Sequence, residues 1–325
     1  MPPFLGGLVL LHSERKVSMP IKVPDGLPAI DILREENISL IPDSLAFRQD
    51  IRPLRIGIVN NMPLKPDTER DLLRLLGNSP IQVEVTFLHS ASHLSRNTDP
   101  SHIARFYKDF KEVQDSLFDG FVFTGADVET LPYSEVSYWE EFKTKLEWTR
   151  SHVYSTLHIC WGAQAGLFYH YGIEKHKLPQ KLFGVFPHTI SKPSSPLLQG
   201  FDDVFFAPHS RHTDILREDI QHSSSLEILS ESEVAGVYLV ARKDGRQIFV
   251  TGHPEYSRHT LEAEYTRDMA RGRPITLPAN YFPQDDALRH PIMSWRGHAH
   301  LLITNWLTTL YKTTPFNLKD LVPIV

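Results

Sequence analysis

The sequence predicts an α/β protein: a single domain built on one doubly wound, mostly parallel β-sheet. Three observations support this. Short apolar runs alternate with amphipathic segments through the first half of the 325-residue chain, as strands and helices do in such a sheet. A hydrophobic content of 41% is enough for a substantial core. The sequence contains no internal repeat, low-complexity segment or Gly/Ser linker at which to divide it.

The beginning of the chain is expected to lie outside the domain. Met19 and the PIKVP that follows it are typical of a natural start, so residues 1–18 are expected to form a disordered extension and residues 19–325 the domain. The apolar run at 4–11 lacks the positive leader and the cleavage site of a secretory signal. No stretch reaches the roughly 18–20 apolar residues of a spanning helix, so a cytoplasmic protein with no membrane partner is expected.

Apolar runs and their Gly, Pro and polar boundaries predict the elements in order. After an irregular arm with one short helix at 31–36, buried strands are expected at 55–61, 81–87, 120–125 and 153–159. Helices are expected at 67–76, 103–113, 138–150 and from about 162 to 171. Shorter strands follow at 182–186, 204–207, 237–241 and 247–251, the last two joined in a hairpin by a turn at Gly245. The last helices are expected at 259–270 and 298–311.

Charge and cysteine content exclude several classes of function. The net charge is −5, from 34 basic and 39 acidic residues, so no nucleic-acid partner is indicated. One cysteine excludes an internal disulfide and a cysteine-rich zinc site. The 17 histidines include no HExxH pair, and no metal site is predicted.

The single cysteine, Cys160, is the first candidate for catalysis. It follows the β-leaning run 153–159 and precedes the small residues Gly162, Ala163, Ala165 and Gly166. This order predicts a strand, a sharp turn and a helix, which is the setting of a nucleophile elbow. The helix N-terminus favours a thiolate, and its free N–H groups can stabilise an oxyanion. The alternative is an inert cysteine in the core.

A candidate base follows the predicted strand at 247–251. His253 lies where that strand ends, at the same sheet edge as Cys160 if both strands are parallel. Glu255 could hold the far nitrogen of the imidazole, as the carboxylate of a triad does, and Pro254 between them stiffens the backbone. The alternative is a solvated histidine beside a glutamate that leads into a helix. The strand-end cysteine and the strand-end histidine together favour catalysis.

These motifs resemble those of known families. HICWGAQAG with the later GHPE resembles the triad of class I glutamine amidotransferase-like proteins, although His158 replaces the first glycine of Gly-x-Cys-x-Gly, which argues against a glutamine amidase. A more specific resemblance, to the homoserine O-acyltransferase family of methionine biosynthesis, covers the chain from Met19 to its end. The motifs that carry it are MPIKVPDGLPA, IGIVNNMPLK, FDGFVFTGADVE, KLFGVFPH, FDDVFFAPHSRHT, VTGHPEY, NYFPQDD, SWRGHAHLLITNWL and TPFNL.

The resemblance assigns the catalytic roles. Cys160 matches the acyl-thioester nucleophile, His253 the general base and Glu255 its orienting carboxylate. Lys65 matches a lysine that helps to stabilise the oxyanion, and the backbone N–H of Trp161 is the expected second donor.

The resemblance also assigns substrate contacts. Lys181, Ser210 and Arg267 match substrate-binding positions. Glu129 matches a position where a glutamate accompanies acetyl-CoA and a glycine accompanies succinyl-CoA. A carboxylate here would repel the second carboxylate of a succinyl group. Asp127, which stands where the family usually has proline, reinforces this exclusion.

The predicted reaction is ping-pong transfer of an acetyl group from acetyl-CoA, through a Cys160 thioester, to the γ-hydroxyl of L-homoserine. Acetyl-CoA would be a co-substrate, and no bound cofactor is implied. The resemblance suggests a homodimer. Three alternatives stay open: a succinyl-CoA-dependent enzyme, a serine O-acetyltransferase, and a non-catalytic amidotransferase-like binding protein.

Overall fold

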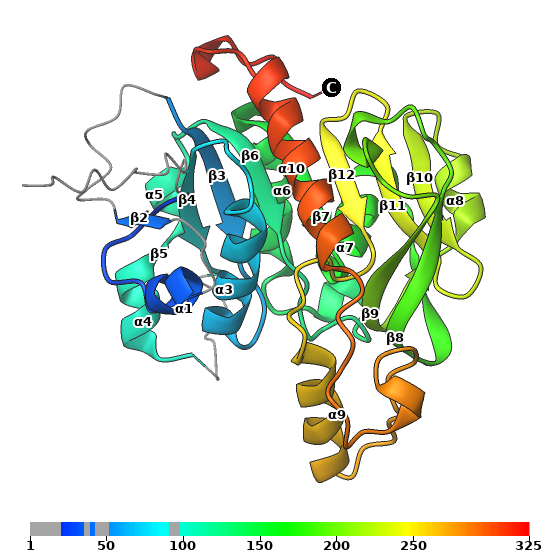
Figure 1. Ribbon diagram of the computed structural model, residues 1–325. Helices are drawn as coiled ribbons and strands as arrows, with labels where there is room; N and C mark the ends of the chain where they lie inside the picture. The colour runs from blue at the N-terminus through cyan, green and yellow to red at the C-terminus, as the bar shows by residue number, and fades with distance from the viewer. Residues whose placement is uncertain (1–20, 36–39, 43–51, 91–97, 325) are drawn as a thin grey trace, which may run out of the picture.

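The computed structural model describes residues 21–35, 40–42, 52–90 and 98–324. The expected extension, residues 1–18, lies outside the described residues. One twelve-stranded sheet runs through the described chain, with helices on both of its faces (Figure 1). The predicted α/β architecture with a doubly wound sheet is confirmed. None of the helices in this part of the chain combines the length and the apolarity that a membrane span requires.

The sheet has a parallel half and an antiparallel half. The parallel half runs in the order β2 (Leu40–Pro42), β1 (Ile21–Val23), β4 (Val83–Leu88), β3 (Leu54–Val59), β6 (Phe118–Phe123), β7 (Val153–Ile159) and β12 (Gln247–Val250), and the short β5 (Tyr107–Lys108) pairs with β4. The antiparallel half continues with β11 (Gly236–Arg242), β10 (Leu226–Ser232), β8 (Lys175–Ile190) and β9 (Val204–Ile215). Strand β12 joins the halves, since it is parallel to β7 and antiparallel to β11.

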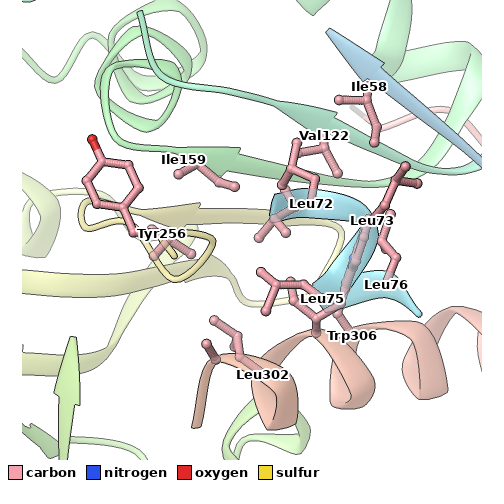
Figure 2. Close-up of a cluster of buried hydrophobic side chains, with 14 of the residues drawn as sticks. Ile58, Leu72, Leu73, Leu75, Leu76, Val122, Ile159, Tyr256, Leu302 and Trp306 are labelled. Carbon is pink, nitrogen blue, oxygen red and sulfur yellow. The ribbon is translucent and has the colours of Figure 1, made fainter. Parts of the chain in front are cut away.

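Side-chain alternation along the strands gives each face its own core. On β6, Val122 packs on the face covered by α1 (Ala29–Glu35), α3 (Lys65–Leu76) and α10 (Arg296–Thr313). Phe121 and Phe123 pack on the opposite face, with α6 (Trp139–His152) and α7 (Trp161–Tyr171). Figure 2 shows the leucines of α3 between the sheet and α10. Burying one such leucine contributes about 1.5–3 kcal/mol, so these contacts fix α3 against the sheet.

One predicted helix is wrong. The segment 103–113 was expected to be a single helix, but the chain forms α4 (Pro100–Phe106), β5 and α5 (Phe110–Val113). The break is at Tyr107, which is buried and pairs with Phe87 of β4. Its hydroxyl donates to Glu69, 2.5 Å away. Asp109 and Glu112 then form a capping box that starts α5. Tertiary contacts at Tyr107 therefore override the local helical pattern.

The antiparallel half also differs from expectation. The predicted strands 182–186 and 204–207 are parts of the much longer β8 and β9, and β10 was not predicted. The hairpin of β11 and β12 is confirmed, and Gly245 has the expected positive φ of 73°. Two further α-helices of the described residues are α8 (Arg217–Gln221) and α9 (Thr260–Ala270). Helix α9 and the segment after it extend beyond the edge at which the parallel strands end (Figure 1).

Candidate active site

Cys160 lies on a strained turn between β7 and α7. Its backbone φ is 51° and ψ is −117°, a conformation that costs a non-glycine residue of the order of 1–3 kcal/mol. Its N–H donates to the carbonyl of Val250 across the sheet, at 2.7 Å. A Cβ atom at Gly162 would lie 2.7 Å from the Thr124 carbonyl oxygen, so only glycine lets α7 begin this close to β6. The predicted elbow is confirmed.

The parallel pairing of β7 and β12 brings the histidine to the cysteine. Val250 of β12 pairs with Ile159 of β7, so both strands end at the same edge of the sheet. A Cβ atom placed on Gly125 would lie 3.4 Å from Cys160 Cβ and equally far from His253 Cε1. The thiol and the imidazole therefore meet around Gly125. Both residues are buried.

Glu255 holds the imidazole from the other side. His253 Nδ1 lies 2.7 Å from Glu255 Oε1, and the ring stacks on Tyr256 with 4.0 Å between centroids. Burial by itself lowers the pKa of His253, but the Cys160 sulfur and the Glu255 carboxylate raise it to well above that of a free histidine. The raised pKa favours the imidazolium form of His253, which lies between the Cys160 sulfur and the Glu255 carboxylate.

The two expected oxyanion donors lie in different settings. Trp161 is the first residue of α7, and the N–H of a first helical residue has no acceptor within its helix. Lys65 is buried at the start of α3, and its ammonium donates to the carbonyl of Asn60. It does not line the cavity at Cys160. Burial lowers the pKa of Lys65 to about 8, against the opposing effect of Glu69.

A cavity of about 330 Å³ opens beside the reactive pair. Six of the predicted site residues line it: Cys160, Glu129, Lys181, Ser210, His253 and Arg267. They come from both halves of the sheet and from α9, since Cys160 follows β7, Ser210 lies in β9 and Arg267 lies in α9. The structure thus brings together residues that are far apart in the sequence.

Glu264 is a site residue that the sequence reasoning missed. Its Oε2 accepts a hydrogen bond from Ser210 Oγ at 2.5 Å and lies 3.2 Å from Lys181 Nζ. Its Oε1 accepts from the hydroxyl of Tyr256 at 2.9 Å. Glu264 precedes Arg267 by three residues on the predicted helix, so helical spacing could have placed both on one face. One carboxylate therefore connects three walls of the cavity.

Basic and acidic side chains are balanced along this part of the cavity wall. Arg267 Nε and Nη2 lie 2.9 and 3.0 Å from the two oxygens of Asp268. Arg273 Nη1 and Lys181 Nζ lie 3.7 and 3.8 Å from the same carboxylate. A small zwitterion could exchange with these ion pairs without leaving an unpaired charge.

Glu129 closes another side of the cavity. Its Oε1 accepts from the backbone N–H of His212 at 3.1 Å, and Lys175 Nζ donates to its carbonyl at 2.7 Å. Burial raises the pKa of Glu129 to about 7, helped by Asp127 and opposed by the His212 hydrogen bond and by His253. Its side chain therefore changes charge near neutral pH.

No group of three or more His, Cys, Asp or Glu side chains in the described chain could hold a metal ion.

The fold places this site in a known structural class. A glutamine amidotransferase of Thermotoga maritima matches with a TM-score of 0.54 and 10% identity, over 81% of this chain and 100% of that one. A putative GMP synthase subunit of Thermoplasma acidophilum matches with a TM-score of 0.52 and 15% identity, over 80% and 96%. The fold is therefore that of class I glutamine amidotransferases.

Sequence relationships narrow this class to one family. The model of the homoserine O-succinyltransferase family matches residues 20–316, and the chain belongs to that family. A homoserine O-acetyltransferase of Acetivibrio thermocellus is 55% identical over 93% of this chain and 100% of its own length. One of Brevibacillus brevis is 56% identical over 93% and 99%. The expected family relationship is confirmed.

Proposed function

We propose that this protein transfers an acetyl group from acetyl-CoA to the γ-hydroxyl of L-homoserine, giving O-acetyl-L-homoserine for methionine biosynthesis. The observation that carries the proposal is the meeting of Cys160 and His253 beside a cavity with paired charges on its wall. The names of the two relatives support the choice of donor and acceptor.

The first half of the reaction loads the cysteine. The Cys160 thiolate attacks the thioester carbon of acetyl-CoA, and the carbonyl oxygen becomes an oxyanion beside the N–H of Trp161. When the intermediate collapses, the bond to the CoA sulfur breaks. His253 gives its proton to the departing CoA thiolate, and an acetyl-cysteine thioester stays on the protein.

The second half of the reaction unloads it. The neutral imidazole of His253 takes the hydroxyl proton of homoserine as the oxygen attacks the acetyl carbon. The carbon–sulfur bond breaks, Cys160 leaves as a thiolate, and the imidazolium is restored. Glu255 holds the ring in the correct tautomer through both halves, because its oxygen accepts from Nδ1.

The charged cavity wall suits the amino-acid end of homoserine. The carboxylate of Glu264 can accept the substrate ammonium, and Lys181 and Arg267 can bind the substrate carboxylate. Each of these three groups already lies in an ion pair on the cavity wall, so the substrate would replace one partner with another. Ser210 donates to Glu264 and orients its carboxylate.

Lys65 has a conditional role. Its ammonium is directed to the Asn60 carbonyl in the loop after β3, so a contact with the oxyanion requires a rotation of the side chain. The same loop carries Met62, whose sulfur would lie 3.4 Å from a Cβ atom placed on Gly125, as Cys160 Cβ would. With its side chain rotated, Lys65 would stabilise the oxyanion directly. Without this rotation, its hydrogen bond to Asn60 would hold the loop after β3 in place.

Acetyl-CoA is the proposed donor because Glu129 lines the cavity. A buried carboxylate would repel the free carboxylate of a succinyl group.

A homodimer is proposed from family resemblance. Sedimentation of the purified protein tests this oligomeric state.

The decisive experiment combines mass spectrometry with a donor-by-acceptor assay. Incubation with acetyl-CoA alone should give one acetyl group per chain, and Cys160→Ala should give none while keeping the wild-type melting temperature. Product formation should be fastest with acetyl-CoA and homoserine among the four pairs formed by acetyl- or succinyl-CoA with homoserine or serine. Normal turnover by Cys160→Ala would exclude the thioester scheme.

A further inference from the structure

We propose that the acyl donor binds along a channel with two compartments: an apolar groove between α3 and α9 for the pantetheine arm, and a basic cavity between α3 and α10 for the nucleotide phosphates. This inference rests on the proposed use of an acyl-CoA donor. The cavity at Cys160, about 330 Å³, is of the size that fits homoserine and an acetyl group. The rest of the CoA molecule must lie elsewhere on the protein.

The apolar groove continues directly from the catalytic cavity. It has a volume of about 460 Å³ and shares five lining residues with that cavity: Met62, Pro63, Tyr256, Glu264 and Arg267. Its walls are the start of α3, with Leu64, and the face of α9 that carries Ala263. Leu64 is 51% exposed, which leaves apolar surface for a ligand to cover. A pantetheine arm, largely apolar with two amides, fits such a wall.

The basic cavity continues from the far end of the groove. It has a volume of about 720 Å³ and shares six lining residues with the groove: Arg70, Asp71, Glu255, Tyr256, Ser257 and His259. Four arginines line this cavity, against two carboxylates. The arginines are Arg70, Arg74, Arg258 and Arg296, and the carboxylates are Asp71 and Glu255.

The arginines of the basic cavity are not equally available to a ligand. Arg70 lies 2.9 Å from Asp67 and Arg74 lies 2.7 Å from Asp71, so both arginines of α3 are paired. Glu255 is paired with His253. Arg296 is exposed and forms no ion pair within the described residues, and Arg258 donates to a backbone carbonyl. Positive charge therefore remains for the phosphates of the donor, which bind arginine well.

The channel has the right length. Arg74 lies ten residues after Leu64, which corresponds to a rise of about 15 Å along the axis of α3. A pantetheine arm is about as long as four extended residues, roughly 14 Å. With the thioester at Cys160, beside Met62, the diphosphate would therefore reach the turn of α3 that carries Arg70 and Arg74. The other side of the catalytic cavity carries Asp127 and Glu129, which would repel phosphates.

Two variants test the two compartments by separate measurements of acetyl-enzyme formation. Arg296→Glu should slow acetylation by acetyl-CoA about tenfold at low concentrations of the donor and leave acetylation by acetyl-pantetheine, which lacks the phosphates, unchanged. Ala263→Phe should fill the groove and slow acetylation by both donors about tenfold. The matched controls are Arg271→Glu and Ala270→Phe, which are exposed residues outside the channel. Both controls should behave as the wild type.

The outcomes separate this inference from the proposed function. If the wild-type protein forms no acetyl-enzyme, the proposed function fails, and the channel fails with it. If the wild type is acetylated but Arg296→Glu and Ala263→Phe react like their controls, only the channel is refuted. If Arg296→Glu slows acetylation by acetyl-CoA and by acetyl-pantetheine equally, the phosphate site is refuted. The groove is then tested by Ala263→Phe alone.

Discussion

The parallel and antiparallel halves of the sheet contribute different parts of the site. The parallel half supplies the proposed reactive groups: Cys160 follows β7, and His253 follows β12. The antiparallel half supplies cavity walls: Lys181 and Ser210 lie within β8 and β9. In the proposed mechanism, bond making and substrate recognition are therefore carried by separate elements, and α9 closes the cavity between them.

The physical reason lies in how each half presents its residues. Parallel strands all end at one edge, so the residues that follow β7 and β12 meet there. Antiparallel strands present residues along their length. The register of β8 on β9 shifts between Lys177 and Leu182, next to Lys181, and such irregularities redirect side chains. The positions of the proposed catalytic pair thus follow from the sheet topology, and those of the proposed binding residues follow from the local register of β8 and β9.

The largest effect is expected from breaking the parallel half. His253→Asn should lower the rates of acetylation and of transfer to homoserine by roughly 10³-fold, because both steps lose their proton carrier. The Michaelis constants should change little. Rapid-quench measurement of each half-reaction checks this. A loss confined to one half-reaction would contradict the shared role of the imidazole.

A change at the recognition wall should affect only the second half-reaction. Glu264→Gln should lower kcat/KM for homoserine roughly 100-fold, because the substrate ammonium loses its charged partner. Acetyl-enzyme formation should stay at the wild-type rate. Glu262→Gln, on the same helix and paired with the exposed His259, is the control and should change neither value. Equal losses in both half-reactions would show that the two halves of the site are not separable.

The donor preference should respond to Glu129 by a smaller factor. Glu129→Gly should raise the ratio of succinyl-CoA to acetyl-CoA use by about tenfold, because it removes both charge and bulk from the cavity. Competition between the two donors for one enzyme sample measures the ratio directly. An unchanged ratio would remove Glu129 from the specificity argument and leave Asp127 as the next residue to test.

The smallest effect is a pH dependence of the same ratio. Burial raises the pKa of Glu129 to about 7, so its carboxyl is mostly neutral below this pH and mostly charged above it. Discrimination against succinyl-CoA should therefore increase by a few-fold from pH 6 to pH 8. Glu129→Gln, which does not titrate, should show a flat profile. A rise of the same size in Glu129→Gln would assign the dependence to another group.

Several features of this protein follow from the sequence by itself. The apolar runs and their boundaries predict the parallel strands, and the small residues after Cys160 predict the elbow, because these signals are local. The positions of His253 and Glu255 after a strand also follow from these local signals, because an apolar run directly precedes them. The predicted helix at 103–113 does not form as a single helix, because Tyr107 is buried against β4 and donates a hydrogen bond to Glu69. These contacts with distant residues override the local helical pattern.

The tertiary structure alone decided which residues face one another. The pairing of β12 with β7 brings a sulfur and an imidazole together, and that pairing is a long-range contact between segments about ninety residues apart. Glu264 became a site residue because Ser210, Lys181 and Tyr256 converge on it from three elements. The direction of Lys65 likewise depends on packing, since burial turns its ammonium to the Asn60 carbonyl. Such choices are made by packing and charge across the fold, which no local pattern encodes.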